Sequence, residues 1–374
     1  MSNLQTGLAL CPVDIYRHDI VAMVRLVKTL YRLSQMPAYQ QLVAAEIPEI
    51  ARFDPGHQSL MMGYDFHLSE IGPQLIEVNT NAGGGLLAYR TREPDRPEHE
   101  LEPSVRTKEI FLQTFAWEMQ QFSGGVKKRP SRVVVMDETP QKQFLHPEME
   151  ACVELLEQWG VWAVIAAPEE LQGREDGIYY GDERVDFIYN RHCDFYLETP
   201  ALQMVRAAYL KRQLCLSPNP RAYGLLADKR RLLRMSDPEL ATELGLNDAM
   251  ARQLAARIPQ CKMLADMDEA EVWTVRKKWA FKPVSGFGSR GVILGTSMSR
   301  KRFAQLGEQE ILMQSLVPPS RTPCNDSEKG MKTDIRLFVY QDRVLGIAAR
   351  IYKGQVTNFR DEGSGYAPVR IVNG

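Results

Sequence analysis

The chain is organised around the stretch Leu75-Ile76-Glu77-Val78-Asn79-Thr80-Asn81-Ala82-Gly83-Gly84-Gly85. Its apolar start is typical of the end of a β-strand, and the strand period of two places Glu77 and Asn79 on one face. The three glycines that follow allow a sharp turn or a close approach of the backbone to a ligand. A solvated polar strand end is the plain alternative, because a Glu-x-Asn pair alone has little specificity. The rest of the chain therefore has to decide between a binding site and a strand end.

An acidic residue in the preceding strand supports a binding site. We expect this strand at Tyr64–Leu68, with Asp65 inside it. If it pairs with a strand at Gln74–Asn79, the side chains of Asp65, Glu77 and Asn79 converge. Three hard oxygen donors of this kind suit Mg²⁺, which usually keeps some waters and bridges to substrate phosphates. The sequence thus predicts a magnesium site on these two strands.

Composition and charge exclude several classes of protein. The 374 residues are 44% hydrophobic and 25% charged, as in ordinary globular proteins, and such a length predicts two or three lobes. A formal net charge of -1 gives no electrostatic case for a nucleic-acid or membrane partner. Six scattered cysteines without a Cys-x-x-Cys pair argue against a zinc ribbon or a disulfide framework and fit a reducing compartment. With no recognisable signal sequence or membrane span, we expect a cytoplasmic enzyme.

Hydrophobic periodicity predicts an α/β fold in three regions, at residues 1–128, 129–225 and 226–374. The middle region alternates strand, helix and strand, which is typical of a small parallel α/β domain. The expected helices are Asp19–Leu33, Tyr39–Arg52, Thr107–Phe122, Pro147–Trp159, Pro200–Arg212 and a helical stretch from Ala227 to about Arg257. The expected strands of the middle region are Arg132–Met136, Val161–Ile165 and Asp186–Tyr189, with a hairpin at Leu171–Val185.

A glycine-rich hairpin is expected in the third region. The strand Trp279–Pro283 ends on Lys282 and leads into small residues before an apolar run, Val292–Leu294. The small residues are Ser285, Gly286, Gly288, Ser289 and Gly291. Such a loop can present successive backbone N–H groups to phosphate oxygens, although it lacks the Gly-Lys-Ser/Thr ending of a P-loop. An ordinary glycine hairpin is the alternative, and the lysine that closes the buried strand favours phosphate binding.

The polar faces of the last strands also indicate phosphate binding. Thr333–Tyr340 alternates cleanly and Arg343–Ile351 follows after a tight turn, before a polar loop at Gln355–Gly365. Their polar residues include Arg336, Arg350, Asn358 and Arg360. Salt-bridged exposed faces would explain any one of these residues. All four beside a glycine loop favour phosphate binding.

These motifs together resemble the ATP-grasp superfamily. The residues that carry the resemblance are Lys229, Lys282-Pro283 with the glycine hairpin, Glu310–Pro319, Asp334-x-Arg336, Arg350, and Asp65 with Glu77-x-Asn79. In that family two antiparallel sheets clamp ATP, and an Asp and a Glu-x-Asn hold the magnesium ions. The Glu-x-Asn strand usually comes last, whereas here it precedes the glycine loop. This order is similar to the circularly permuted branch, typified by eukaryotic glutathione synthetase and its bacterial relatives.

The resemblance implies an α+β fold in which antiparallel sheets clamp ATP beside a small parallel α/β substrate domain, with ATP and Mg²⁺ as cofactors. It assigns ATP binding to Lys229, Lys282, Ser285, Gly286, Gly288, Ser289, Gly291, Gln314 and Asp334. It assigns the metal to Asp65, Glu77 and Asn79, and catalysis to Arg336, Arg350, Asn358 and Arg360. It assigns substrate binding to Arg191 and Arg90. The glycine loop lacks the metal-binding glutamate of glutathione synthetase, and Asp65 would supply that ligand.

The reaction implied is that of a carboxylate–amine ligase. A substrate carboxylate attacks the γ-phosphate of ATP, and an amine then displaces phosphate from the acyl phosphate. The expected partners are small-molecule carboxylates and amines, with a homodimer as one open oligomeric state. Two alternatives remain: another ATP-grasp acyl or phosphoryl transfer, and a non-catalytic ATP-binding regulatory module.

Overall fold

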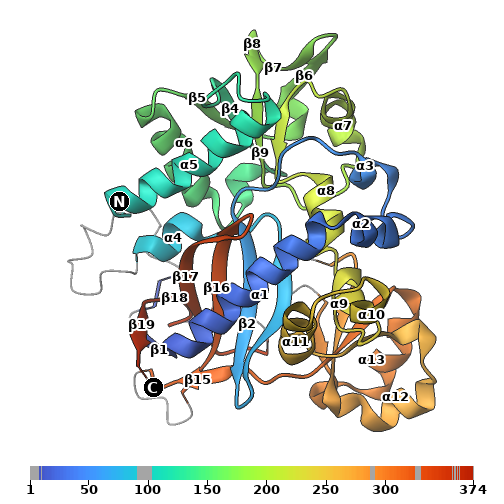
Figure 1. The fold of residues 1–374 in the computed structure, drawn as a ribbon. Helices are drawn as coiled ribbons and strands as arrows, with labels where there is room; N and C mark the ends of the chain where they lie inside the picture. The colour runs from blue at the N-terminus through green and yellow to red at the C-terminus, as the bar shows by residue number, and fades with distance from the viewer. Residues whose placement is uncertain are drawn as a thin grey trace.

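Two lobes flank a central sheet in the computed structural model of the protein (Figure 1). The structure describes residues 8–9, 11–90, 103–286, 291–324, 330–355, 357, 359, 361 and 363–373, and the side chains of residues 89 and 90 lie outside this description. An upper lobe holds residues 105–217, and a lower lobe holds residues 230–315. The mixed α/β architecture expected from the sequence is confirmed.

The central sheet joins strands from both ends of the chain. Its order is β18 (Gly365–Ala367), β17 (Arg343–Tyr352), β16 (Met331–Tyr340), β2 (Met62–Ser69) and β3 (Gly72–Asn79), with β15 (Ser320–Thr322) beside β16. Every pair of neighbouring strands is antiparallel. In Figure 1 the blue strand β2 accordingly lies next to the red strand β16.

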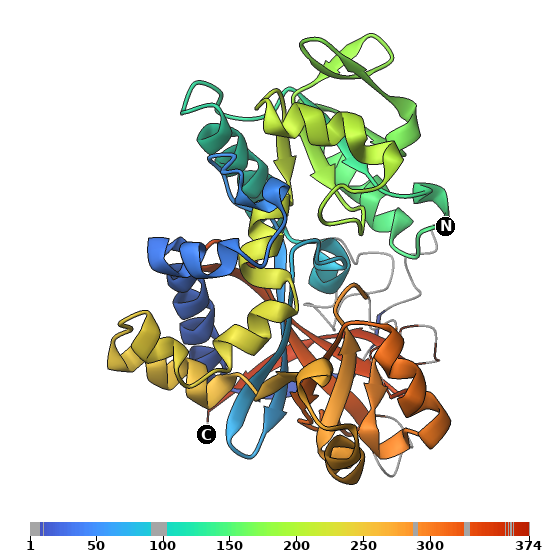
Figure 2. The same ribbon diagram turned by 90° about the vertical axis from the view of Figure 1, so that its right-hand side faces the viewer.

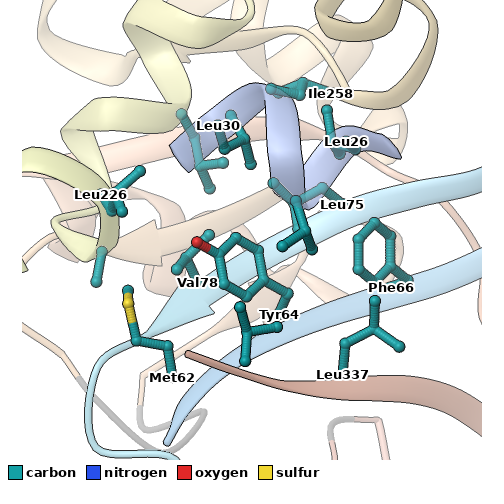
Figure 3. Packing of buried hydrophobic residues seen from close by; sticks show 14 of the residues in the cluster. Leu26, Leu30, Met62, Tyr64, Phe66, Leu75, Val78, Leu226, Ile258 and Leu337 are labelled. Atoms are coloured by element: carbon teal, nitrogen blue, oxygen red, sulfur yellow. The ribbon is translucent and has the colours of Figure 1, made fainter. Parts of the chain in front are cut away.

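Alternation along β2 separates a core face from a polar face. Tyr64 and Phe66 are fully buried beneath helix α1 (Arg17–Gln35), where they meet Leu26 and Leu30 (Figure 3). Burying one such apolar side chain is worth about 1.5–3 kcal/mol, so this face fixes the register of the strand. The intervening Asp65 must then point to the opposite face of the sheet.

The two ends of the chain also meet outside the central sheet. Strand β1 (Val13–Tyr16) pairs in parallel with β19 (Val369–Val372). A disulfide joins Cys11 to Cys324, 313 residues apart in sequence. The expectation that the cysteines form no disulfide is therefore wrong for this pair. Scattered spacing cannot reveal a bridge whose partners are brought together only by tertiary structure.

The upper lobe is built on a parallel sheet, as predicted. Its strand order is β10 (Cys215–Ser217), β9 (Phe187–Asn190), β4 (Arg132–Met136) and β5 (Trp162–Ala166). Helices α5 (Val105–Phe122), α6 (His146–Gln158) and α7 (Gln203–Leu210) belong to this lobe. The predicted hairpin is a three-stranded sheet of β6 (Leu171–Arg174), β7 (Gly177–Tyr180) and β8 (Glu183–Val185).

The lower lobe contains a second antiparallel sheet. Its order is β11 (Cys261–Met263), β14 (Ile311–Ser315), β12 (Trp279–Pro283) and β13 (Ile293–Leu294). The pairing of β12 with β13 confirms the predicted hairpin, of which residues 287–290 lie outside the description. Helices α12 (Glu269–Val275) and α13 (Arg300–Ala304) complete this part. Figure 2 shows its orange strands beside the strands of the central sheet.

Two helices expected as single elements are divided. Tyr39–Arg52 forms α2 (Pro37–Ala44) and α3 (Glu49–Arg52), because Pro48 cannot continue a helix. The stretch from Ala227 to Arg257 forms α9 (Arg230–Met235), α10 (Leu240–Glu243) and α11 (Asp248–Arg257), with Pro238 and Gly245 at the breaks. The remaining helices are α4 (Gly85–Arg90) and α8 (Pro220–Ala222), which leads into a π-helical turn at Tyr223–Ala227. No helix in the described part of the chain has the length and apolar character needed to cross a membrane.

Candidate active site

The three predicted metal ligands lie together on the polar face of the central sheet. Asp65 and Glu77 are direct neighbours on β2 and β3. The Asn79 side-chain amide donates to Asp65 Oδ2 and to Glu77 Oε1, at 3.2 Å each. The period of two thus places all three side chains together as expected, with the amide nitrogen of Asn79 directed at the two carboxylates.

Asp65 is also the anchor for two arginines. Arg336 donates to both of its carboxylate oxygens at 2.7 Å, and Arg350 Nη2 lies 2.9 Å from Oδ2. Burial alone would raise the pKa of Asp65, but the two guanidinium groups outweigh it and hold this pKa below its usual range. Asp65 is therefore a buried carboxylate at the centre of a charge cluster.

A second carboxylate completes this cluster. Asp334 accepts from Arg350 Nε at 2.5 Å and from the Thr357 hydroxyl at 2.7 Å. The two carboxylates and the two arginines come from β2, β16 and β17. The cationic surface expected from the sequence is thus a balanced, buried network in its described part. Asn358 and Arg360, which were predicted beside it, lie outside the described residues.

The side chain of Lys282, on β12 of the lower lobe, contacts the central sheet. Its ammonium group donates to the carbonyl oxygen of Ile76 at 2.9 Å and to Gln314 Oε1 at 2.6 Å. Ile76 is free to accept because a β-bulge between β2 and β3 leaves it without a partner in the ladder. Burial lowers the pKa of Lys282, and nearby Glu77 opposes this shift. The predicted lysine therefore faces the predicted metal-binding strand.

Lys229 lies against the glycine hairpin. Its ammonium group donates to the carbonyl oxygens of Gly286 and Val284, the latter at 3.4 Å. Burial lowers its pKa, with Glu77 again opposing. Gly291 has a φ of 76°, and an added Cβ would lie 2.9 Å from Pro283 Cγ, so a glycine is required there. Ser285 and Gly286 are described, whereas Gly288 and Ser289 lie outside the described residues.

An open cleft lies between the two antiparallel sheets. Its lining includes Asp65, His67, Glu77, Lys282, Gln314, Asp334 and Arg350. The cleft thus brings together residues from β2, β3, β12, β14, β16 and β17. Strands separated by more than 200 residues in sequence, such as β3 and β12, share one site.

One residue of this cleft, His67, was missed in the sequence, whereas Gln314 was expected to bind ATP. His67 contributes a ring nitrogen, Nδ1, that lies 2.6 Å from the carbonyl oxygen of Val317, on the segment after β14. Burial lowers the pKa of His67. Gln314 holds Lys282 with its oxygen, while its buried Nε2 has no hydrogen-bond partner among the described residues. His67 could have been found from the period of two that also gives Asp65.

The triple glycine forms the junction with the upper lobe. The carbonyl oxygen of Gly83 accepts from the Tyr366 hydroxyl at 2.7 Å and from Arg336 Nη1 at 3.2 Å. The backbone N–H groups of Gly84 and Leu86 donate to the carboxylate of Glu148, at 2.7 and 2.9 Å. These contacts tie the segment after β3 to β18, β16 and α6. The sequence indicated a sharp turn here but not its partners.

Arg191 lies next to this turn, directly after the carboxyl end of β9. Its Nη1 donates to the Asn81 carbonyl oxygen and to the Tyr189 hydroxyl, at 3.2 Å each. Asp137, at the end of β4, lies near it, and burial raises the pKa of this carboxyl. The predicted substrate residue thus joins the edge where ligands of open α/β sheets bind. The side chain of Arg90, the other predicted substrate residue, lies outside the described residues.

Comparison with known proteins shows a likeness in fold. No protein-family model and no curated protein sequence matches the chain. A glutathione synthetase-like effector from Globodera pallida, solved in its apo form, aligns with 98% of this chain and 90% of its own, at 12% identity and a TM-score of 0.58. A putative gamma-glutamylcysteine synthetase from Methylobacillus flagellatus KT aligns with 90% of this chain and 83% of its own, at 12% identity and a TM-score of 0.53. The protein therefore shares its fold with these two structures.

Proposed function

We propose that this protein is an ATP- and Mg²⁺-dependent carboxylate–amine ligase of the circularly permuted ATP-grasp type. One observation carries the proposal: in one cleft the buried Lys282 faces three carboxylates and the guanidinium group of Arg350, and the partly buried Lys229 lies against the neighbouring hairpin. Such a set can neutralise a triphosphate and hold its terminal phosphate against a second substrate. The substrate class that we propose is a small amino acid or peptide.

ATP would lie along the cleft with its phosphates at the lysine side. Lys229 and Lys282 would release their carbonyl partners and bind phosphate oxygens, beside the hairpin residues Ser285, Gly286, Gly288, Ser289 and Gly291. The base would lie along the segment after β14. The free Nε2 of Gln314 supports this position, because a buried donor without a partner calls for an acceptor from a ligand.

Magnesium fits the end of β3. Glu77 forms no ion pair with a lysine or arginine among the described residues, and its carboxylate is partly exposed to the cleft. Glu77 therefore offers the kind of hard oxygen ligand that Mg²⁺ prefers, and Asn79 would add its own oxygen after rotation of its amide group. Asp65 lies beside them but is engaged by two arginines, so it would contribute through one shared oxygen. The ion would supply charge neutralisation of the phosphates.

The chemistry would run in two steps. A carboxylate oxygen of the substrate attacks the γ-phosphorus, the bond to ADP breaks, and an acyl phosphate forms. The amine then attacks the acyl carbon, phosphate leaves with the C–O electron pair, and the amine loses a proton. Arg336 and Arg350, with Asn358 and Arg360, would stabilise the transferring group and the tetrahedral intermediate.

The acceptor would be held by the upper lobe. We assign residues 129–225 to a substrate-binding domain, between ATP-binding parts at 1–128 and 226–374. Arg191, with Arg90, would bind a substrate carboxylate. ATP as a substrate favours a cytoplasmic location, where the Cys11–Cys324 disulfide would form only under oxidation. A homodimer is the oligomeric state that we propose.

ADP release tests the proposal. Purified protein with Mg-ATP and a mixed pool of amino acids and short peptides should release ADP, and hydroxylamine should trap the acyl phosphate as a hydroxamate. Glu77→Ala should abolish both signals, whereas Lys301→Ala, at an exposed position on α13, should leave them unchanged. Tight ATP binding without any ADP release across the pool would instead indicate a regulatory nucleotide-binding module. ADP release without hydroxamate would indicate another phosphoryl transfer.

A further inference from the structure

A buried cluster of potential metal ligands lies outside the ATP cleft. It consists of His57, before β2, Glu118 on α5 and Cys215 on β10. Their relative exposures are 3%, 0% and 0%, and their candidate ligand atoms all lie within 4.8 Å of one another. None of the three lines the cleft described above. The ATP-dependent reaction therefore gives this cluster no role.

The spacing of the three side chains is close to that of a coordination shell. His57 Nδ1 lies 2.8 Å from Glu118 Oε2, and Cys215 Sγ lies 3.9 Å from both ring nitrogens of His57. With metal–ligand distances of about 2.0–2.3 Å, the ligand atoms of a tetrahedral zinc site lie roughly 3.2–3.8 Å apart. The sulfur–nitrogen distances lie just above this range, and the Nδ1–Oε2 distance lies below it.

Neighbouring groups hold the carboxylate in place. Glu118 Oε1 accepts from the backbone N–H of Gln58 at 3.1 Å and from the Tyr340 hydroxyl at 2.9 Å. The Tyr340 hydroxyl in turn accepts from Gln121 Nε2 at 2.6 Å. Outer hydrogen bonds of this kind orient the ligands of metal sites. They also leave Glu118 Oε2, the oxygen nearest to His57, on the inner side of the cluster.

A buried His–Glu hydrogen bond alone is the competing explanation. It accounts for the contact between His57 and Glu118, but it gives no role to Cys215. The sulfur of Cys215 lies 3.9 Å from each ring nitrogen of His57, at the upper limit for a hydrogen bond to sulfur. The combination of thiolate sulfur, imidazole nitrogen and carboxylate oxygen suits zinc-class ions, whereas Mg²⁺ prefers oxygen alone. The donor set therefore differs in kind from that of the cleft.

We propose that His57, Glu118 and Cys215 bind a divalent transition-metal ion of the zinc class in a structural site. The ion replaces the thiol proton of Cys215, which passes to solvent, and the ring proton of His57 moves from Nδ1 to Nε2. No electron transfer is involved. Tyr340 keeps its hydrogen bond to Glu118. The bound ion ties helix α5 and strand β10 of the upper lobe to the segment that leads into β2.

Cobalt binding tests the site without recourse to enzyme activity. Tag-free, full-length protein is titrated with Co²⁺ alone, in the absence of nucleotide. We expect about one equivalent to bind, with a thiolate-to-cobalt charge-transfer band that Zn²⁺ removes by displacement. The oxygen ligands Glu77 and Asp65 cannot produce this band, so cobalt in the ATP cleft is distinguished.

Matched cysteine variants locate the ligand. Cys215→Ser should abolish the band, whereas Cys193→Ser, at a partly exposed thiol, and Cys261→Ser, at a buried thiol on β11, should retain it. A variant-free measurement covers the case in which Cys215→Ser does not fold: Zn²⁺ should protect Cys215 of the wild-type protein from alkylation during partial denaturation. Absence of both the band and the protection in the wild type would overturn the proposal, as would a band that survives in Cys215→Ser.

Discussion

The ammonium group of Lys282 lies 2.9 Å from the carbonyl oxygen of Ile76, and this hydrogen bond joins the lower lobe to the central sheet. Ile76 can accept because the bulge in the pairing of β2 with β3 removes it from the ladder. The contact brings a buried cation to the strand that carries Glu77. The bulge thus provides a direct hydrogen bond between the two halves of the proposed ATP site.

Replacing Lys282 by Met should weaken nucleotide binding at least tenfold, which is about 1.4 kcal/mol. Methionine fills a similar volume but removes the cation from the cleft. The change also leaves Gln314 Oε1 without its donor, so the free energy of unfolding should fall by about 1–3 kcal/mol. Calorimetric titration with ATP and thermal unfolding measure the two effects. The exposed Lys301→Met is the control, and an unchanged ATP affinity in Lys282→Met would contradict the assignment.

Asp65 should make stability depend on pH in the acid range. Its pKa in the folded protein lies below the value of about 4 in the unfolded chain. The unfolded state therefore takes up the proton first, so the stabilisation is complete above about pH 4 and is lost as pH falls further. Asp65→Asn should cost about 3–5 kcal/mol at neutral pH, because Arg336 and Arg350 lose a buried partner. Urea unfolding should be measured between roughly pH 3 and pH 7. The free energy of unfolding should depend less on pH in the variant than in the wild type.

Two glycines with positive φ should respond very differently to alanine. At Gly84, with a φ of 88°, an added Cβ would lie 2.0 Å from the Tyr366 hydroxyl oxygen. At Gly124, with a φ of 62°, nothing lies within 4 Å of an added Cβ. Both changes cost about 1–2 kcal/mol of backbone strain, and only Gly84→Ala adds a steric clash with a buried ring. Thermal unfolding of the pair isolates the clash, and equal losses would show that the turn can move away from Tyr366.

The Cys11–Cys324 disulfide should stabilise the protein by about 2–5 kcal/mol, because it closes a long loop in the unfolded chain. Reduction should lower the melting temperature of the wild-type protein. Cys11→Ser should melt at that lower temperature with or without a reductant. If the wild type and the variant melt together under non-reducing conditions, the bridge does not form in solution. Cys152→Ser, at a buried free thiol, is the control for loss of a sulfur.

Strand alternation was the most informative signal in the sequence. It placed Asp65, Glu77 and Asn79 on one face, and it separated Asp334, Arg336 and Arg350 from the apolar residues between them. The structure agrees because one face of the central sheet is packed against α1, so a shift of one residue would bury the charged side chains. The boundaries of long helical stretches were less well predicted, because Pro48, Pro238 and Gly245 divide them.

The sequence by itself determined the chemical types and their local faces: oxygen donors two apart on β3, a lysine closing β12 and a glycine-rich hairpin. Only the tertiary structure decided which of these groups meet. The bulge at Ile76, the two arginines on Asp65, the Tyr366 contact to Gly83 and the cluster of His57, Glu118 and Cys215 all join residues distant along the chain. Local periodicity carries no information about such pairs, since their positions follow from the packing of the two lobes against the central sheet. The stretch from Leu75 to Gly85 therefore predicted the oxygen ligands of the proposed site. The tertiary structure determined which distant residues lie opposite them.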